Sequence, residues 1–398
     1  MAVYKHLIAL LALFSMITTA LAADNETPTD LENQYSVFLK DGITSSEIDT
    51  HLAWVEDLHK NSPGFKQGLT GVTGRFDIGD TYGYDGEFDE STIKQIEDRP
   101  EESSPWGLAA LSSREPGASS YKYDDRAGEG FFAYIVDVGF ELGHEELGGR
   151  LSLGPNFTIP RIPINSFHGT AVAGALGSNT YGAAKKAQMI GVTVSTRGNG
   201  IYKGILWIIN DIKSKKRSGR AVINVSMEKD LIRTADGLSA VQHVEKLITN
   251  AWNQGVLIFF AAGNSGAEVS KDPIPYPMAI SSPHITVGAL SENWDKAHDS
   301  NFGPLVDIYA PGENIIVLNG RSGVTTAKGT SLASPLVAGM ALTLLATMDP
   351  LPKAEDTARI LAKEILDTAT RYKIGGIPDA GPDELQLVAF NDGRGDPR

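Results

Sequence analysis

The stretch Gly329-Thr330-Ser331-Leu332-Ala333-Ser334-Pro335 follows a glycine-punctuated run that we expect to be poor in strands, and it opens a long apolar segment, 336–348. That segment predicts a buried helix with Ser331 at its N-terminal end. A helix N-terminus offers unpaired N–H groups and a dipole that favours negative charge, while Gly329 allows the tight turn that lifts the hydroxyl out. Ser331 therefore lies where a nucleophile is needed beside a forming oxyanion. The alternative is an ordinary Ser/Thr helix cap.

Two further polar residues mark places where predicted elements end or begin. Asp137 lies near the end of the apolar run 131–138, where a carboxylate needs a partner to stay charged. His168 precedes small residues that indicate a helix packed closely on a sheet. A histidine can take the serine proton and return it to a leaving amine, and an aspartate fixes its tautomer. Each residue alone has an ordinary alternative, a turn-capping Asp or a core or surface His.

A fourth polar residue, Asn264, follows the apolar run 256–261. At the end of a predicted strand, its amide can donate a hydrogen bond to an oxyanion. The alternative is a turn asparagine. The chain order Asp137, His168, Ser331 is that of subtilisin, and in the heptad only Leu332 replaces the methionine of the family motif. On these residues the chain resembles the subtilisin-like serine proteases over about residues 105–392. The resemblance implies a serine endopeptidase that acts on proteins or peptides through an acyl-enzyme and requires no cofactor.

The order of apolar runs predicts the fold class of the main domain. Short runs rich in β-branched residues suit strands buried on both faces, and helical patterns lie between them. We therefore expect an α/β domain with a doubly wound parallel sheet, whose functional residues gather beyond the strand carboxyl ends. The predicted strands are 131–138, 189–194, 221–225, 256–261 and 285–289, and the predicted helices include 202–215 and 236–252.

The N-terminal part of the chain predicts two further segments. Residues 1–22 combine Lys5, an apolar run and a small-residue cleavage site, which is typical of a secretory signal peptide and predicts an extracellular protein. Residues 23–102 contain a small α+β unit, and its segments 35–37, 51–54 and 83–90 resemble the inhibitory, I9-like propeptide of secreted fungal subtilases. Residues 103–398 then form the catalytic domain. Within that unit we expect strands at 35–39, 71–78 and 81–88, and helices at 45–59 and 89–98.

The resemblance also predicts the substrate-binding segments. The family clamps an extended peptide between two edge segments by strand addition. The corresponding segments here are Gly198-Asn199-Gly200 and Ser226-Met227-Glu228-Lys229.

Several positions depart from the family pattern. Val138 replaces a Thr or Ser that supports the aspartate, Phe167 replaces a Gly, and Ala171 replaces a second His. Glu228 and Lys229 replace a Gly pair beside the primary specificity pocket. The last propeptide strand is missing, because residues 96–102 lead almost directly into the catalytic domain. These departures keep two alternatives open: a secreted pseudoprotease that acts as a binding protein, and a permanently autoinhibited precursor.

Composition limits the partners. A net charge of −14 argues against nucleic acid and anionic membranes, and the chain has no cysteine and hence no disulfides. We expect a monomer that binds protein or peptide substrates and its own propeptide. No cluster shows transition-metal spacing. By resemblance, Asp307 lies where some family members place a calcium-binding carboxylate, with the carbonyls of Pro283 and Ile285 as partners. The alternative is a solvated Asp at the start of a strand. Asn156-Phe157-Thr158 predicts a glycosylated surface loop.

Overall fold

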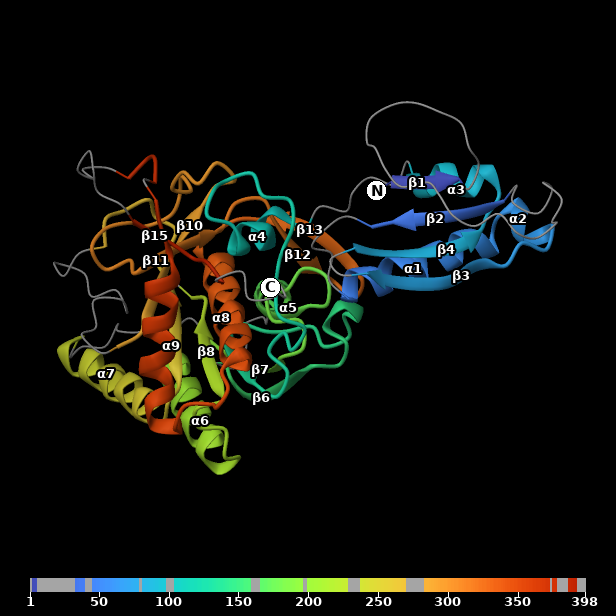
Figure 1. Cartoon of the computed structure of the whole chain (residues 1–398). Helices are drawn as coiled ribbons and strands as arrows, with labels where there is room; N and C mark the ends of the chain where they lie inside the picture. The colour runs from blue at the N-terminus through green and yellow to red at the C-terminus, as the bar shows by residue number, and fades with distance from the viewer. Residues whose placement is uncertain are drawn as a thin grey trace. The chain divides into compact units, whose positions relative to one another are not determined.

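The computed structural model describes residues 2–5, 33–39, 45–78, 81–97, 104–158, 165–195, 199–227, 237–269, 283–372, 374–377 and 386–391. It divides the chain into two compact units, Met1–Glu102 and Ser103–Arg398 (Figure 1). The division falls where the sequence places the end of the propeptide.

The first unit is an antiparallel sheet with strand order β1-β2-β4-β3 and associated helices. Its core contains Val37, Val55, Tyr84 and Phe88, all fully buried. Asp89 directly precedes α3 and caps its first turn, since its Oδ1 accepts a hydrogen bond from Thr92 N at 3.0 Å. The elements are β1 Ala2–Lys5, β2 Gln34–Phe38, α1 Ser45–Lys60, α2 Pro63–Lys66, β3 Gly71–Ile78, β4 Thr81–Glu87 and α3 Glu90–Glu97.

The predicted strand and helix order is confirmed from residue 34 onward, with strand β1 and the short α2 as unpredicted additions. Strand β1 lies inside the predicted signal peptide and pairs with β2. The described residues do not include 6–22 of that segment. They also exclude 98–103, part of the stretch where the sequence predicts that the last propeptide strand is missing.

The second unit is built on a large sheet with strand order β14-β15-β11-β10-β9-β8-β5-β7-β6. Its strands pair in parallel, except for the antiparallel pair β14–β15. The predicted doubly wound α/β class is therefore confirmed. The strands are β5 Phe132–Asp137, β6 Leu151–Phe157, β7 Gln188–Val194, β8 Ala221–Val225, β9 Leu257–Ala261, β10 Ile285–Leu290, β11 Ile308–Pro311, β14 Thr370–Tyr372 and β15 Gln386–Val388.

Hydrophobic clusters cover both faces of this sheet, because successive side chains of a strand point to opposite faces. On β5, Ile135 belongs to the cluster shared with α5, α8 and α9, whereas Tyr134 and Val136 belong to the cluster shared with α6 and α7. The helical elements of the unit are α4 Trp106–Ala109, η1 Ala110–Ser112, η2 Glu145–Leu147, α5 Ser166–Gly177, α6 Gly200–Ser214, α7 Gly237–Asn253, α8 Thr330–Thr347 and α9 Ala354–Thr368.

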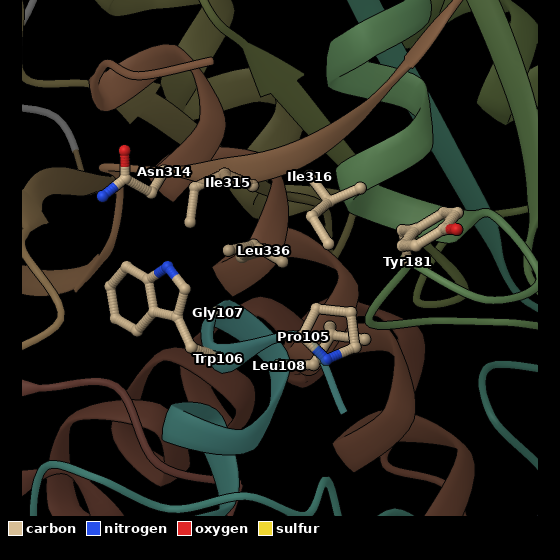
Figure 2. Close-up of a pocket in the computed structure, with 9 residues that line it drawn as sticks. All are labelled: Pro105, Trp106, Gly107, Leu108, Tyr181, Asn314, Ile315, Ile316 and Leu336. Atoms are coloured by element: carbon tan, nitrogen blue, oxygen red, sulfur yellow. The ribbon is translucent and has the colours of Figure 1, made fainter. Parts of the chain in front are cut away.

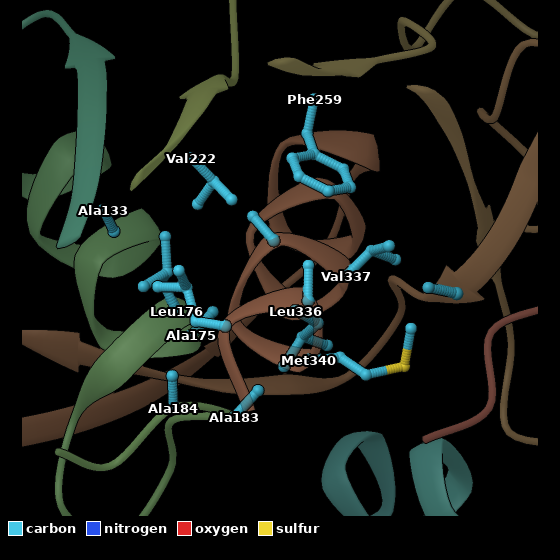
Figure 3. Close-up of a cluster of buried hydrophobic side chains, with 14 of the residues drawn as sticks. Ala133, Ala175, Leu176, Ala183, Ala184, Val222, Phe259, Leu336, Val337 and Met340 are labelled. Carbon is cyan, nitrogen blue, oxygen red and sulfur yellow. The ribbon is translucent and has the colours of Figure 1, made fainter. Parts of the chain in front are cut away.

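Helix α8 is the central element of the first of these clusters. Figure 3 shows its residues Leu336, Val337 and Met340 among side chains from the sheet, Val222 and Phe259. Among the described residues α8 is the helix that is long and apolar enough to cross a membrane, but 89% of it is buried inside the protein. Its apolar composition is therefore explained by the core, and the predicted buried helix behind Ser331 is confirmed.

The expectation of few strands before the heptad was wrong. β12 Ile315–Asn319 and β13 Gly323–Ala327 form an antiparallel hairpin there. Ile315 and Val317 pack against Ala171 of α5 and Leu332 of α8. Gly320 lies in the turn between the two strands, and Gly323 is the first residue of β13. The buried apolar contacts of Ile315 and Val317 stabilise the hairpin.

The expectation of a surface loop around Asn156 was also wrong, because Asn156 and Phe157 belong to the edge strand β6. The Asn156 side chain is nevertheless exposed. Asn224, which begins the second sequon Asn224-Val225-Ser226, is in contrast fully buried on β8.

Candidate active site

Asp137 and His168 are brought together from two elements. Asp137 is the last residue of β5, and His168 lies in the first turn of α5. His168 Nδ1 lies 2.8 Å from Asp137 Oδ1 and 3.0 Å from Oδ2. Since an ionised carboxylate only accepts hydrogen bonds, Nδ1 carries the proton and Nε2 is left as the basic nitrogen.

The surroundings of this pair tune the histidine. The Asp137 side chain is 0% exposed and that of His168 is 36% exposed. Burial disfavours the charged imidazolium, but attraction and hydrogen bonding by Asp137 outweigh it, so the pKa of His168 is raised above its ordinary value. The imidazolium that forms when His168 takes a proton is thereby stabilised.

Ser331 is the second residue of α8, directly after the turn at Gly329, whose φ of 135° favours glycine. Its Oγ donates to the carbonyl oxygen of Ser226 at 3.2 Å, and Ser226 Oγ donates in return to the carbonyl of Ser331 at 2.9 Å. Within the described residues no hydrogen bond joins Ser331 to His168. The serine hydroxyl is thus held against the carboxyl end of β8.

A buried polar chain behind Ser331 fixes α8 to β8. Asn224, at 0% exposure, accepts a hydrogen bond from Ser334 Oγ at 2.8 Å and donates one to Ser226 Oγ at 2.8 Å. Sequence reasoning did not assign Asn224 a role. The available signal was an amide within the otherwise apolar run 221–225, because a buried amide requires partners.

Asn264 follows β9 and is oriented by the residue before the serine. Thr330 donates to Asn264 Oδ1 from its backbone N at 2.8 Å and from its Oγ1 at 3.1 Å. Thr330 Oγ1 also accepts from Gly263 N at 3.0 Å. With Oδ1 engaged as an acceptor, Nδ2 is the atom of this side chain that can donate to a reacting oxygen. This role of Thr330 was not predicted, although the residue is part of the quoted heptad.

The predicted substrate segments are described only in part. Asn199 is exposed at the start of α6, while Gly200 is buried in its first turn. Ser226 and Met227 are buried after β8, at 1% and 7% exposure. Gly198, Glu228 and Lys229 lie outside the described residues. A peptide at the second segment would therefore meet backbone atoms, because the Met227 side chain belongs to the core.

The positions that depart from the family pattern have different surroundings. Val138 packs against the cluster beneath α6 and α7, and its backbone N donates to Asp137 Oδ1 at 2.7 Å. Ala171 is buried against the β12–β13 hairpin. Phe167, directly before His168, is 40% exposed. The hydrogen bonds between Asp137 and His168 are formed in the presence of all three of these side chains.

A cavity of about 60 Å³ lies in the second unit, between α4, the β12 strand and α8 (Figure 2). Its lining is almost wholly apolar, including Trp106, Ile315 and Leu336. No candidate site residue lines it. The polar constellation around His168 and Ser331, and not this cavity, is therefore the candidate site.

Asp307, proposed as a calcium ligand, is engaged with the start of β10. Its Oδ2 accepts a hydrogen bond from Thr286 N at 2.7 Å. Burial raises the pKa of the Asp307 carboxyl, which the hydrogen bond from Thr286 and the nearby His284 oppose. Among the residues that the structure describes, the buried Thr286 Oγ1 has no hydrogen-bond partner. We propose Asp307 as a ligand of a structural calcium ion, because calcium prefers hard oxygen ligands such as a carboxylate.

Known structures define the class of this protein. The crystal structure of a cold adapted subtilisin-like serine proteinase is similar to this chain with a TM-score of 0.58 and 28% sequence identity, covering 73% of this chain and 98% of that one. The fold is therefore that of the subtilisin-like serine proteases, and the Asp137–His168 pair lies on it at the carboxyl end of the sheet.

Sequence relatives give the family. The profile of the Subtilase family matches residues 129–386. An alkaline proteinase of Hapsidospora chrysogena is 34% identical over 89% of this chain and 92% of that protein, and alkaline protease 1 of Aspergillus flavus is 32% identical over 92% of each. Subtilisin-like protease 2 of Trichophyton equinum is 35% identical over 88% of this chain and 91% of that protein.

The chain belongs to the subtilase family. It is a subtilisin-like serine protease, a hydrolase whose substrates are proteins or peptides.

Proposed function

We propose that this protein is a secreted endopeptidase in which Asp137, His168 and Ser331 form the catalytic triad and Asn264 stabilises the oxyanion. The observation that carries the proposal is the fully buried Asp137 carboxylate on His168 Nδ1, which leaves Nε2 as the base. Ser331 supplies the nucleophile from the start of α8, and Thr330 links this residue to Asn264.

The reaction proceeds in two steps on these residues. Ser331 Oγ exchanges its hydrogen bond with Ser226 O for one with His168 Nε2, attacks the scissile carbonyl carbon and gives its proton to Nε2. Asn264 Nδ2 and the backbone N–H of Ser331 stabilise the oxyanion. The leaving amine takes the proton from His168, and an acyl-enzyme remains. Water then attacks the ester by the same route and releases Ser331.

The substrate binds as an extended strand between the segments 198–200 and 226–229. Residues 23–102 act as the propeptide that inhibits the catalytic domain until it is removed, and residues 1–22 direct secretion. The fungal origin and the names of the relatives, alkaline proteinases and subtilisin-like proteases, support this proposal. The protein acts as a monomer.

The test compares wild type with Ser331→Ala, both secreted and shown to be folded by circular dichroism. A fluorophosphonate probe should label the wild type at Ser331, and casein hydrolysis should fall on the order of a millionfold in the variant, the size of the loss in subtilisin. Ser214→Ala, an exposed serine of α6, is the matched control and should keep full activity. Mass spectrometry of the same sample should find an N-terminus near residue 103.

Each contrary result has its own meaning. Equal hydrolysis by wild type and Ser331→Ala contradicts the proposed triad. A wild type that neither hydrolyses casein nor takes up the probe would indicate the pseudoprotease. Labelling of a chain that keeps residues 23–102 would indicate a persistent precursor.

A further inference from the structure

The ammonium group of Lys296 is enclosed by backbone carbonyls of the loop that follows it. Nζ donates to the carbonyl oxygens of Ala297 at 3.0 Å, of His298 at 3.1 Å and of Ser300 at 3.1 Å. An ammonium has three N–H donors, and these bonds use all of them. We refer to these carbonyls together as the Lys296 cage.

The cage is completed by an aromatic face, since Lys296 Nζ lies 5.6 Å from the ring centroid of Phe302. Burial lowers the pKa of Lys296, and the nearby carboxylates of Asp299 and Glu313 oppose that shift. The negative ends of convergent carbonyl dipoles repel one another without a cation between them. The curled path of residues 297–300 therefore depends on a positive charge at this point.

The same loop holds the turn that carries Asn264. Asn301 Oδ1 accepts hydrogen bonds from Ser265 N at 3.1 Å and Ala267 N at 3.0 Å, and its Nδ2 donates to Ala262 O at 2.9 Å. Asn301 N also donates to Gly263 O. The turn on both sides of Asn264 is thus bonded to Asn301.

The residues next to Asn301 add further bonds to this turn. Gly266 N donates to Asp299 O at 2.9 Å, and Phe302 N donates to Ala267 O at 3.1 Å. Asp299 lies between two carbonyls of the cage, and Phe302 forms its aromatic face. A change in the path of the loop would therefore be transmitted to the backbone of residues 263–267.

We infer that Lys296 is a positioning residue, a tethered cation that occupies a carbonyl cage and thereby holds the Asn264 turn in place for the reaction. This inference rests on the proposed function of Asn264. It adds a residue that lies outside the predicted site and touches neither the substrate nor the triad. Its chemistry is that of a primary ammonium, which combines a positive charge with three N–H donors.

Hydrogen exchange tests the structural part of this inference without any assay of activity. In Lys296→Met the amides of 265–267 should exchange at least about tenfold faster than in wild type, because each depends on Asn301 or Asp299. The amides of β9 should be unchanged. Lys363→Met is the matched control, an exposed lysine of α9 paired with Asp367, and should exchange as wild type.

Kinetics and chemical rescue test the catalytic part. Lys296→Met should lower kcat by between about 10- and 100-fold with KM changed less than about threefold, as expected for a misplaced oxyanion donor. Lys296→Arg keeps the charge and donors, so it should retain most of kcat. In Lys296→Ala, n-propylammonium should restore both kcat and slow exchange, since it supplies the atoms that the substitution removes. Tetramethylammonium, with the same charge but no N–H group, should restore neither.

Unchanged exchange at 265–267 in Lys296→Met overturns the inference, even if the wild type proves inactive and the proposed function fails by itself. Faster exchange with kcat within twofold of wild type also overturns it, because the turn would then not limit the reaction. Equal rescue by both ammonium ions overturns it as well, since bulk charge would explain the effect. If Lys296→Met does not fold, the Lys296→Ala rescue decides the question.

Discussion

At the scale of single residues, the candidate site is built on the hydrogen bonds that the buried carboxylate of Asp137 accepts. Asp137 is 0% exposed and accepts hydrogen bonds from His168 Nδ1 and Val138 N. Val138 replaces the Thr or Ser of the family pattern, so its side chain has no hydroxyl that could donate to this carboxylate. His168 therefore supplies the only side-chain donor that the described residues give to this carboxylate. The strength of the pair shows in the raised pKa of His168.

The first prediction concerns the pH dependence of activity. His168 must be neutral to act as a base, so kcat/KM should fall on the acid side with a midpoint above 6.5, the ordinary histidine value. In Asp137→Asn the attraction that raises the pKa is lost while burial still lowers it, so the midpoint should move to lower pH. The residual rate should drop by on the order of 10⁴ because the tautomer is no longer fixed.

The measurement is a pH–rate profile with a peptide substrate, supported by NMR titration of the imidazole in Ser331→Ala. Asp356→Asn is the control, because that aspartate of α9 pairs with Arg359 rather than with His168. An acid limb that stays in place in Asp137→Asn would contradict the assigned role of Asp137.

At the scale of elements, the position of Ser331 follows from how closely α8 packs. Gly339 of α8 faces α5, and a Cβ at this position would lie 2.6 Å from the carbonyl oxygen of Leu176. On its other side the helix is bonded to β8 through Ser334 and Asn224. A glycine in the middle of a helix is otherwise unfavourable. The close approach of the two helices is therefore the physical reason for this residue.

The second prediction is that Gly339→Ala destabilises the protein although alanine is the better helix former. The gain in helix propensity is about 1 kcal/mol, whereas forcing the helices apart in a packed core costs typically about 1–3 kcal/mol. We expect a lower urea midpoint in the Ser331→Ala background, which avoids autolysis. A midpoint equal to that of the parent, or higher, would show that α5 and α8 can separate freely. Ser214→Ala should leave the midpoint unchanged.

At the scale of the whole molecule, a chain without cysteine is held together by core packing and hydrogen bonds. The two clusters on opposite faces of the sheet supply the packing in the second unit. We propose that Asp307, whose carboxylate accepts a hydrogen bond from Thr286 N, is a place where a hard cation adds stability.

The third prediction is that millimolar calcium raises the melting temperature relative to chelator, because a ligand that binds only the folded state stabilises it by mass action. The measurement is a thermal scan of Ser331→Ala protein in calcium and in EDTA. In Asp307→Asn the difference between the two conditions should shrink, while magnesium should have a smaller effect than calcium in both proteins. A melting temperature that is the same in calcium and in EDTA would contradict the proposed calcium site at Asp307.

The sequence by itself determined the strands β5, β7, β8, β9 and β10 and helices α6 and α8. Local periodicity and apolar composition specify such elements because they are buried on one or both faces. It also marked Asp137, His168, Asn264 and Ser331 as candidates, since each lies where a predicted element ends or begins. The hairpin β12–β13 was missed because glycine-rich connections hid two strands whose stability comes from packing on α5 and α8.

Only the tertiary structure decided how these residues meet. The pairing of His168 with Asp137, the hold of Thr330 on Asn264 and the hydrogen bond of Ser331 to Ser226 join residues far apart in the chain. The Lys296 cage was invisible for a different reason. Its ligands are backbone carbonyls, which every residue possesses, so no side-chain pattern marks them and only the path of the folded chain brings them to one cation.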